Sequence, residues 1–497
     1  MMDRDNGGTG LSRRELLVRA GAGTIVLTAP GLLEACGGGS ERRTLSPTPP
    51  SADEWRQFAG TTLNFISENT APTSAIAANL KPFRDLTGIN VKISQLELSA
   101  LVQKVALDFA SGIGSYHVVY ADPYQVLAPY HSALAELNQF NDDPNLPKVT
   151  DLRDFIPTQL DAAGKFVNRQ TLYTLPYDAP TLIWMYRKDI FAKYRKRMQD
   201  DLGFDPIPND NSTWEQFYAI SKWIRKNARA DVPYGSGHQA KQHDSLMNDF
   251  SNVLWAYGGD YFRNGNDVGR YGSDDPGEPL LDTPESIAGA DMYNKLVSIA
   301  HPGSKGWDWT GLAEAFQAGQ VAMMAEWHEF ASAFETGKLA GKVGYARLPR
   351  GPRRSANMYG GTGIGVNGVA PEREQKAAWL FVNWATSPKT QLANLKSKVG
   401  GGTPTRESIY KLPEVERARK PPSSMPNVLT TNAVFEAWQP NNIGLRPKIA
   451  AWNECDTVIF TELSKMLAGS QSPQSCMKNA KKGFEAAIDR AAALRRQ

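Results

Sequence analysis

The segment TLNFI at positions 62–66 begins a series of alternating strand and helix patterns that decides the fold. Its apolar, β-favouring residues predict a short buried strand. The stretch 73–87 then predicts a helix, and NVKI at 90–93 predicts a second strand. An amphipathic stretch at 98–111 is followed by YHVVY at 116–120, which predicts a third strand. Strand–helix–strand spacing of this kind builds parallel sheets, so we expect an α/β fold.

The length and composition are those of a folded protein with enough hydrophobic residues for more than one core. The chain has 497 residues, of which 41% are hydrophobic, 10% aromatic and 22% charged, and this excludes wholesale disorder. The formal net charge is only +3 at pH 7, so no basic field points to a nucleic-acid partner. The one membrane-directed stretch, at the N-terminus, is too short to span a bilayer, which argues against a multi-pass membrane protein.

The first 36 residues are typical of an export signal. Arg13 and Arg14 stand just ahead of a small-residue and apolar run at 20–33. This order resembles a twin-arginine signal, which exports proteins in the folded state, with the general secretion route as the alternative. We therefore expect 1–36 to be a processing segment and not part of the fold.

The end of this segment suggests a lipid anchor. LEAC at 33–36 is followed by GGGS and resembles a bacterial lipoprotein box, in which Cys36 becomes the lipidated new N-terminus. Glu34 departs from the small residue usual at its place, and an ordinary signal with an unmodified thiol is the alternative. Residues 37–54, rich in Pro, Gly, Ser and Thr, predict a flexible tether.

Two further cysteines, Cys455 and Cys476, remain once Cys36 is assigned. An even remainder in an exported protein predicts a disulfide between them. It would close a loop of about 20 residues and contribute on the order of 3 kcal/mol of stability. Two buried free thiols are the alternative. No His or further Cys lies at ligand spacing, so no zinc site is expected.

Motifs for catalysis are incomplete or absent in this sequence. HEFAS at 328–332 begins like a zinc-protease helix, but Ser332 occupies the place of the second histidine. The phosphate loop, the dinucleotide fingerprint and the G-x-S-x-G elbow are absent from the sequence. We therefore expect a protein that is not an enzyme and that uses no cofactor and no metal. A pair of carboxylates for glycoside hydrolysis remains an alternative, because its spacing is spatial.

Seven segments, taken in order, resemble the sugar-type extracellular solute-binding proteins of bacterial ABC importers, which are solute-binding family 1 and relatives of maltose-binding protein. The resemblance covers essentially residues 60–490, and the run FQAGQVAMM is its most specific part. The seven segments are 83–91, 116–122, 175–189, 316–324, 348–351, 377–388 and 402–406.

The resemblance implies a two-lobed, periplasmic-binding-protein-like α/β fold, with hinge-connected lobes that close over a ligand in the cleft between them. Lobe 1 is expected to comprise 55–175 plus 355–397, and lobe 2 to comprise 176–354 plus 398–497. The implied function is that of a lipid-anchored receptor on the outer face of the cytoplasmic membrane. It would capture a sugar or oligosaccharide, deliver it to an ABC permease and act as a monomer.

Polar residues that directly follow predicted strands are candidate ligand contacts, because open parallel sheets bind ligands beyond the carboxyl ends of their strands. Glu68 and Asn69 follow the first strand, and Asp122 and Tyr124 follow the third. A turn-forming or capping role is the alternative for each of them.

Further candidates come from the segments that carry the resemblance. Tyr177 and Asp178 lie at the presumed first crossing between the lobes, with hinge packing as the alternative. Glu326 and Trp327 follow the strand expected at 322–324. The resemblance implies that an aromatic residue at this place stacks on the sugar, whereas the alternative for Trp327 is a core position.

The remaining candidates rest on composition and position. Gly361 and Thr362 lie in a loop where only glycine lets the backbone approach a ligand closely. Trp255 suits a cleft wall as well as a buried helix face, and Arg406 is the candidate that would suit a phosphate. Less positional support exists for Trp438, Arg446 and Trp452.

Three other functions stay open. A receptor for a phosphorylated polyol, such as a glycerophosphodiester, would need a cluster of arginines or a helix N-terminus at the phosphate. A secreted carbohydrate-active hydrolase would turn its ligand over. A binding protein that reports to a sensor kinase would bind the same ligand without feeding transport.

Overall fold

The computed structural model describes residues 52–149, 151–399 and 401–495. The predicted export signal with Cys36, and the tether up to Ser51, lie outside the described residues. The first described helix, α2 (Ala52–Arg56), begins inside the expected tether, because Trp55 packs against an apolar core and acidic residues occupy the first turn. Among the described residues, every helix is too short or too polar to cross a bilayer.

The first sheet has the strand order β2-β1-β3-β10-β4. Its strands are β1 (Thr62–Glu68), β2 (Asn90–Leu96), β3 (Val118–Ala121), β4 (Thr174–Asp178) and β10 (Thr362–Val366). β1 runs parallel to β2 and β3, whereas β10 is antiparallel to β3 and β4. The three strands predicted at the start of the domain are thus confirmed, as is their parallel arrangement.

One predicted helix is two helices in the structure. The stretch 73–87 is divided into α3 (Ala71–Ala78) and α4 (Leu80–Thr87) by Asn79, whose φ of −112° and ψ of 18° are not helical. The N–H of Asn79 donates to the Ile76 carbonyl and closes α3. Asparagine favours such a break because its side chain competes with the helical backbone for hydrogen bonds.

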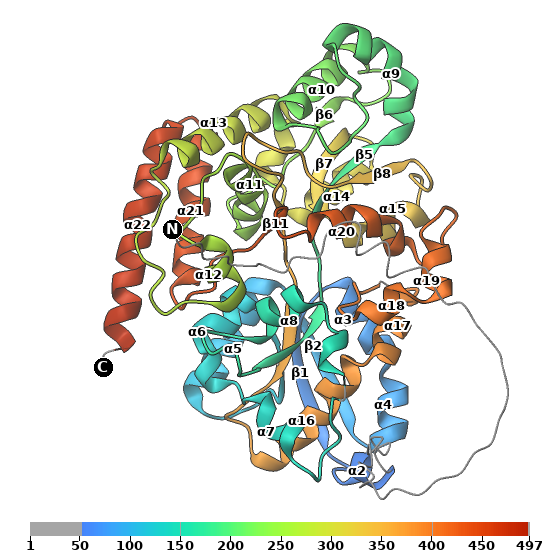
Figure 1. Ribbon diagram of the computed structural model, residues 1–497, viewed down its shortest axis with the longest axis vertical. Helices are drawn as coiled ribbons and strands as arrows, with labels where there is room; N and C mark the ends of the chain where they lie inside the picture. Colours follow the sequence, from blue (N-terminus) through green and yellow to red (C-terminus); the bar gives the residue numbers. More distant parts are fainter. Residues whose placement is uncertain (1–51, 150, 400, 496–497) are drawn as a thin grey trace, which may run out of the picture. The chain divides into compact units, whose positions relative to one another are not determined.

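The second sheet has the order β6-β7-β5-β8. It comprises β5 (Leu182–Arg187), β6 (Tyr234–Ser236), β7 (Val321–Trp327) and β8 (Val343–Ala346). β5 is antiparallel to β7 and β8, and β6 is parallel to β7. Figure 1 shows this sheet and the first sheet as separate layers, each covered by its own helices.

Two segments of chain connect the two sheets, and a third segment runs beside them. The first leads from β4 directly into β5 through residues 179–181. The second contains β9 (Asn357–Met358) and continues into β10, and the third contains β11 (Ile443–Gly444), which pairs in parallel with β9. The fold is therefore α/β and two-lobed, with the crossing segments side by side. The lobe boundaries expected from the sequence stay a prediction.

Helices cover both sheets. Their bounds are α5 Leu98–Ser111, α6 Ala128–Tyr130, α7 Leu137–Asp142, α8 Pro157–Gly164, α9 Lys188–Leu202, α10 Trp214–Asn227, α11 Asp244–Ala256, α12 Gly265–Tyr271, α13 Pro284–Ile299, α14 Trp309–Gln317, α15 Ala331–Thr336, α16 Glu372–Ala385, α17 Pro388–Leu395, α18 Glu407–Tyr410, α19 Pro413–Ala418, α20 Thr431–Ala437, α21 Trp452–Leu467 and α22 Pro473–Arg495. Short helices are η1 Pro123–Leu127, η2 His131–Ala133, η3 Leu152–Asp154, η4 Pro302–Gly306, η5 His328–Phe330 and η6 Pro426–Thr430.

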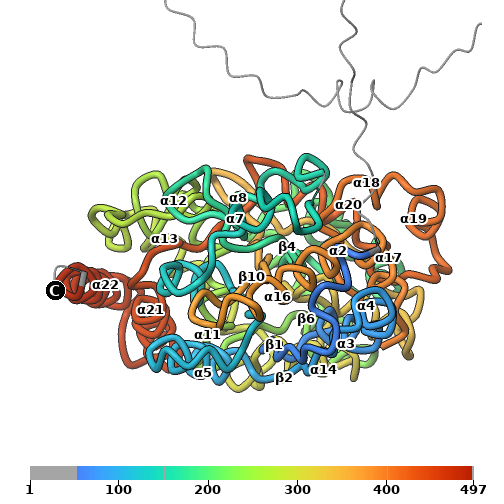
Figure 2. The backbone as a smooth tube through the Cα atoms, turned by 90° about the horizontal axis from the view of Figure 1, so that it is seen from below, coloured from blue at the N-terminus to red at the C-terminus, as the bar shows by residue number. Residues whose placement is uncertain are grey.

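Each sheet has a large hydrophobic core of its own. The core of the first sheet includes Phe65 on β1 and Phe381 on α16, whose rings lie 5.6 Å apart. The core of the second sheet includes Trp184 on β5 and Trp214 on α10. It extends through Trp452 into the helices α21 and α22, which lie side by side (Figure 2). Burial of apolar surface on both sides of the crossing segments stabilises each lobe separately.

The predicted disulfide between Cys455 and Cys476 is wrong, since both are free, buried thiols. Each is the fourth residue of its helix, α21 and α22, and these helices form a hairpin in which Val458 faces Gly483. The two sulfurs therefore lie near opposite ends of the hairpin, separated by on the order of 10 Å along its axis. A disulfide needs Cα atoms within about 7 Å. Both thiols instead pack as small apolar groups in the second core.

Candidate functional site

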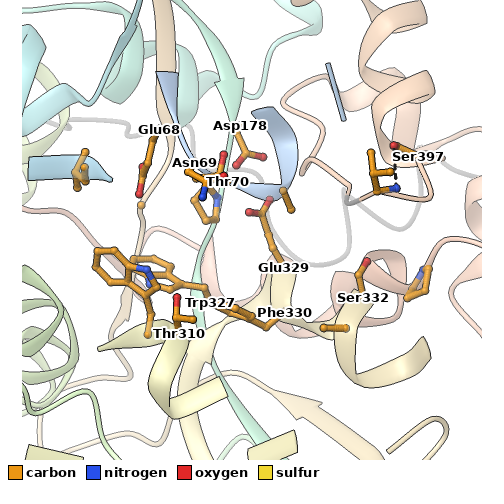
Figure 3. A pocket seen from close by; sticks show the side chains of 18 of the residues that line it. Glu68, Asn69, Thr70, Asp178, Thr310, Trp327, Glu329, Phe330, Ser332 and Ser397 are labelled. Atoms are coloured by element: carbon orange, nitrogen blue, oxygen red, sulfur yellow. Dashed lines mark hydrogen bonds between the residues drawn. The ribbon is translucent and has the colours of Figure 1, made fainter. Parts of the chain in front are cut away.

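A pocket of about 680 Å³ is lined by residues from both lobes. Figure 3 shows Glu68, Asn69, Thr70 and Asp178 on one side of it, facing Trp327 on the other. The polar and aromatic residues that line the pocket, together with one glycine, include Glu68, Asn69, Thr70, Tyr120, Asp122, Asp178, Asp244, Asn248, Trp309, Thr310, Trp327, Glu329, Phe330, Ser332, Gly360, Lys396, Ser397 and Arg446.

The ends of strands place the first group of these residues. Glu68 is the last residue of β1, and Asp178 is the last residue of β4. Thr70 follows β1 and caps α3, because its Oγ1 accepts a hydrogen bond from the Thr73 N–H. Asp122 follows β3 and caps η1. The pocket thus lies at one edge of the sheet, where α/β proteins commonly bind ligands.

Two indoles line the opposite side of the pocket. Trp327 is the last residue of β7 and is partly buried, and Trp309 begins α14 behind its N-cap, Asp308. Gly360 packs against Trp327: a Cβ atom at position 360 would lie 2.7 Å from Cζ3 and 2.8 Å from Cη2 of the indole. Gly360, in the crossing segment after β9, therefore limits how far the indole of Trp327 can move.

Glu68 is a carboxyl group that its surroundings keep protonated. Burial raises the pKa of Glu68 to about 8, and the hydroxyl of Tyr120, which hydrogen-bonds the carboxyl, acts in the opposite direction. The nearby carboxylate of Asp122 raises the pKa further. At neutral pH, Glu68 can therefore both donate and accept a hydrogen bond.

Asp178 and Glu329 form a second acidic pair, in direct hydrogen-bond contact. Burial raises the pKa of Asp178 to about 6, and burial together with the Asp178 carboxylate raises the pKa of Glu329 well above its usual range. Thr403 organises the pair: its N–H donates to Asp178 Oδ1 over 2.7 Å, and its Oγ1 donates to Glu329 Oε1 over 2.5 Å. Burial and mutual repulsion therefore favour retention of a proton by the pair.

Arg446 is a buried cation at the pocket, and its guanidinium is already engaged. Nη2 donates to Asp122 Oδ2 over 2.9 Å, and Nη1 lies 3.9 Å from Asp244 Oδ1. The guanidinium carbon lies 4.2 Å from the centre of the Tyr124 ring. Asp122 is itself held by the N–H groups of Tyr124 and Gln125. This network connects the end of β3 to α11 in the other lobe.

Five of the residues predicted from the sequence line this pocket, namely Glu68, Asn69, Asp122, Asp178 and Trp327. Their contact with a ligand stays a prediction. The other seven predicted contacts do not line it, and their positions have physical reasons.

Two of these corrections follow from the alternation of side chains along a strand. Tyr177 precedes Asp178 on β4 and therefore points away from the pocket, where its ring packs edge-on against Phe65. Glu326 precedes Trp327 on β7 and is fully buried, accepting a hydrogen bond from Gln239 Nε2 over 3.0 Å.

Three more predicted contacts are part of the protein interior. Tyr124 is fully buried beneath Arg446. Trp255 packs in the second core, and its Nε1 donates to Asp260. Arg406 stacks 3.5 Å over the Phe155 ring and donates to backbone carbonyls, including the carbonyl of Thr386. These three side chains therefore pack within the protein and do not line the pocket.

The glycine that lines the pocket is Gly360, one residue before the predicted Gly361. Gly361 faces Tyr359, since a Cβ atom at Gly361 would lie 1.9 Å from that ring, and Thr362 is fully buried in β10. Gly360 takes the place expected for Gly361, with its close approach directed at Trp327.

Sequence reasoning missed several lining residues, among them Trp309, Thr310 and Glu329. A signal existed for the first two, because Asp308 is an N-cap and so places the half-buried Trp309 and the exposed Thr310 at the start of a helix. Glu329 follows Trp327 by two residues on η5, and its segment HEFAS is noted in the sequence only as an incomplete zinc-protease motif. Arg446 was only a weak candidate, and its role depends on contacts distant in sequence.

Comparisons with known proteins agree with this architecture. The family model described as "Bacterial extracellular solute-binding protein" matches residues 67–392. A relative from Sinorhizobium fredii, "Probable amino-acid ABC transporter periplasmic-binding protein y4oP", is 23% identical and covers 84% of this chain and 87% of its own. The "Erythritol/L-threitol-binding protein" of Mycolicibacterium smegmatis is 24% identical, with coverage of 80% and 82%.

Solved structures show the same fold. Maltose-bound MalE3 of T. maritima superposes with a TM-score of 0.70 at 22% identity, covering 86% of this chain and 99% of that chain. An ABC transporter solute-binding protein from Agrobacterium radiobacter K84, in complex with ribitol, gives a TM-score of 0.69 at 22% identity, with coverage of 85% and 98%.

Proposed function

The chain belongs to the family of bacterial extracellular solute-binding proteins, and on that premise we propose that it captures a neutral sugar or polyol for an ABC importer. The observation that carries this proposal is the composition of the pocket, in which indoles face carboxyl groups across the space between two lobes. The related proteins named for erythritol, maltose and ribitol support the same ligand class.

The chemistry of a sugar or polyol fits these walls. Its C–H groups pack on aromatic faces such as those of Trp309 and Trp327, and each hydroxyl both donates and accepts hydrogen bonds. A protonated Glu68 can either donate a hydrogen bond to a ligand hydroxyl or accept one from it, and so can the Asp178–Glu329 pair. The volume of about 680 Å³ lies in the range typical of small-molecule sites.

A phosphorylated polyol fits these walls less well. The guanidinium of Arg446 is paired with Asp122, and Arg406 does not line the pocket. Lys396, at the far end, pairs with Glu414 over 2.6 Å. Lys398 also lines the pocket at that end, where it is exposed to solvent. The lining carboxyl groups outnumber the lysines and would repel a phosphate, so we infer a neutral ligand.

The same argument bears on an amino acid, the solute in the name of one relative. An amino acid needs a cation for its carboxylate and an anion for its ammonium group. The pocket supplies carboxyl groups, but its buried guanidinium is already engaged by Asp122. We therefore propose the neutral ligand ahead of the amino acid, and both belong in the binding panel.

We propose a receptor rather than a hydrolase. Glycosidases keep their two carboxyl groups about 5–9.5 Å apart, so that the reacting carbon lies between them. Asp178 and Glu329 hydrogen-bond each other directly, which leaves no such gap. This pair is suited to bind hydroxyls.

Closure, anchoring and delivery complete the proposal. The two segments that connect the sheets, with the β11 segment paired beside them, suit a hinge, and a ligand that contacts both lobes would stabilise the closed form. We propose that Cys36 carries a lipid anchor, and that the chain acts as a monomer at the outer face of the membrane and meets an ABC permease. A sensor role would use the same binding step.

A thermal-shift panel tests the ligand class. Maltose, ribitol, mannitol, erythritol, a glycerophosphodiester and amino acids would each be added to the purified chain. A neutral ligand at about 100 times its dissociation constant adds about 2.7 kcal/mol of stability. A shift with the glycerophosphodiester or amino acids alone would overturn the proposal, as would appearance of hydrolysis products in the same samples.

A further inference from the structure

A second cavity, of about 400 Å³, lies in the second lobe and shares none of its lining residues with the ligand pocket. Arginine dominates its walls, because the loop RLPRGPRRSA at 347–356 runs between β8 and β9 and carries four arginines. The lining residues are Asp210, Arg347, Arg350, Arg353, Arg354, Ser355, Asn441 and Asn442. We call this the arginine cavity.

The loop that forms the arginine cavity is fixed by backbone hydrogen bonds. Arg350 donates its N–H to the Ser212 carbonyl over 2.9 Å and accepts from the Trp214 N–H over 3.1 Å, which fastens the loop to the start of α10. Arg353 donates its N–H to the Ala256 carbonyl over 3.1 Å, at the end of α11. Two prolines in the loop restrict it further. The backbone that carries the arginines is therefore fixed before any ligand arrives.

Close packing fixes the loop as well. A Cβ atom at Gly351 would lie 2.5 Å from the carbonyl oxygen of Ala256, so the backbone of the loop lies directly on the end of α11. The N–H of Gly351 donates to the Arg354 carbonyl over 2.9 Å and closes a tight turn. Arg350 and Arg353, on either side of Gly351, both line the arginine cavity.

The guanidinium groups of the arginine cavity fall into two classes. Arg354 is tied to the protein, since its Nη1 donates to the Ile443 carbonyl over 2.8 Å, and Arg347 contacts Asp210. Arg350 and Arg353 have no hydrogen bond or ion pair from their guanidinium groups to any other described residue. The cavity therefore offers two unpaired guanidinium groups beside two that are positioned by the protein.

Charge makes the arginine cavity unusual for this chain. Four arginines face one aspartate in its lining, an excess of three positive charges, and the formal charge of the entire chain is also +3. Like charges placed this close repel each other, and an anion between them would relieve the repulsion. Burial already lowers the pKa of Arg354, a cost that an anion would offset.

We propose that the arginine cavity binds a phosphate group, presented either as a free phosphate or phosphomonoester or as the headgroup of an anionic phospholipid. A phosphate carries close to two negative charges at neutral pH and has several acceptor oxygens. It can engage two guanidinium forks at once, whereas a carboxylate has one charge and two oxygens. This site is separate from the proposed sugar pocket, and it does not depend on what that pocket binds.

Calorimetric titration tests the proposal on the full chain. Inorganic phosphate and glycerol 3-phosphate are titrated at constant ionic strength, with acetate as the monovalent comparison. We expect phosphate to bind, acetate to bind at least tenfold more weakly, and the double variant Arg350→Gln/Arg353→Gln to lose at least tenfold in phosphate affinity.

A matched variant controls for net charge. Arg84→Gln/Arg417→Gln removes two exposed arginines elsewhere in the chain and should leave phosphate affinity unchanged. Equal weakening in both variants would show a diffuse charge effect and overturn the proposal, as would absence of phosphate binding together with absence of vesicle binding. Ligand-induced thermal shifts at the sugar pocket should be unchanged in Arg350→Gln/Arg353→Gln, so failure here is distinguishable from failure of the proposed function.

Vesicle sedimentation distinguishes the two sources of phosphate. The full chain with Cys36→Ser, which has no site for the proposed lipid, is mixed with vesicles of phosphatidylglycerol and phosphatidylcholine or of phosphatidylcholine alone. Sedimentation that needs both phosphatidylglycerol and the Arg350/Arg353 pair identifies the lipid headgroup. Phosphate binding without such sedimentation identifies a soluble phosphate. Sedimentation that the Arg350→Gln/Arg353→Gln change leaves intact would contradict a role of the arginine cavity.

Discussion

Gly360 and Trp327 are in such close contact that a Cβ atom at position 360 would lie 2.7 Å from the indole atom Cζ3. The contact joins the end of β7 in one lobe to the segment that crosses between the lobes. Any side chain at position 360 would therefore move the indole that forms a wall of the pocket.

The first prediction concerns that contact. Gly360→Ala should weaken ligand binding by about tenfold, because a loss of about 1.4 kcal/mol from a displaced indole corresponds to that factor. Calorimetric titration with the best ligand from the panel measures the change. Gly306→Ala is the matched control, since a Cβ atom there meets nothing within 4 Å. Equal affinities in the two variants would contradict the role assigned to Gly360.

The second prediction concerns Trp327 itself. Trp327→Ala should abolish the thermal shift caused by the ligand while leaving the melting temperature of the free protein nearly unchanged, because the indole is only partly buried and lines the pocket. Trp55→Ala removes a partly buried indole in α2 that does not line the pocket, and it should leave the ligand shift intact. A large loss of stability in the free Trp327→Ala protein would show that Trp327 is a core residue.

The third prediction follows from Glu68. Burial raises its pKa to about 8 in the folded protein, against an ordinary value of 4.5. Between these pH values the folded state holds a proton that the unfolded chain releases, so stability should fall as the pH rises from about 4.5 to 8. Glu68→Gln should flatten this dependence and raise the melting temperature relative to wild type most at pH 8.

Melting curves of both proteins at pH 5, 6.5 and 8 measure that difference. Asp178 and Glu329 also have raised pKa values, so wild type and variant will share part of the pH dependence. The difference between the two proteins isolates Glu68. Parallel curves at all three pH values would mean that Glu68 ionises normally in the fold.

The fourth prediction concerns the buried thiols. Unfolding the chain without a reductant, in the presence of iodoacetamide, should label both Cys455 and Cys476, because neither is oxidised. A reductant should leave the melting temperature unchanged. Peptides joined through the two cysteines in a mass spectrum would refute the free-thiol arrangement, and a reductant would then remove on the order of 3 kcal/mol of stability.

Local patterns in the sequence predict much of the fold, because they reflect interactions between neighbours in the chain. The first three strands are at their predicted places, since apolar β-favouring segments between helices suit a buried parallel sheet. The division of one helix at Asn79 was not predicted, and neither was the separation of Cys455 from Cys476 along a helical hairpin. Both depend on how helices end and pack.

The pocket is predictable where a strand ends at it. Glu68 and Asp122 are predicted in this way, whereas Asp178 is predicted from its place at the presumed crossing between the lobes. Tyr177 and Glu326 were misplaced because alternation along a strand turns adjacent side chains to opposite faces. Residues such as Arg446 come to the pocket from distant parts of the sequence, and only tertiary packing brings them there.

A crystal structure of the chain with the tightest-binding neutral sugar or polyol tests the central claim most directly. We predict an intact ligand between the two sheets, with its C–H face against Trp327 and its hydroxyls hydrogen-bonded to Glu68 and the Asp178–Glu329 pair. A ligand found elsewhere on the molecule, or a cleaved product in this pocket, would contradict the account.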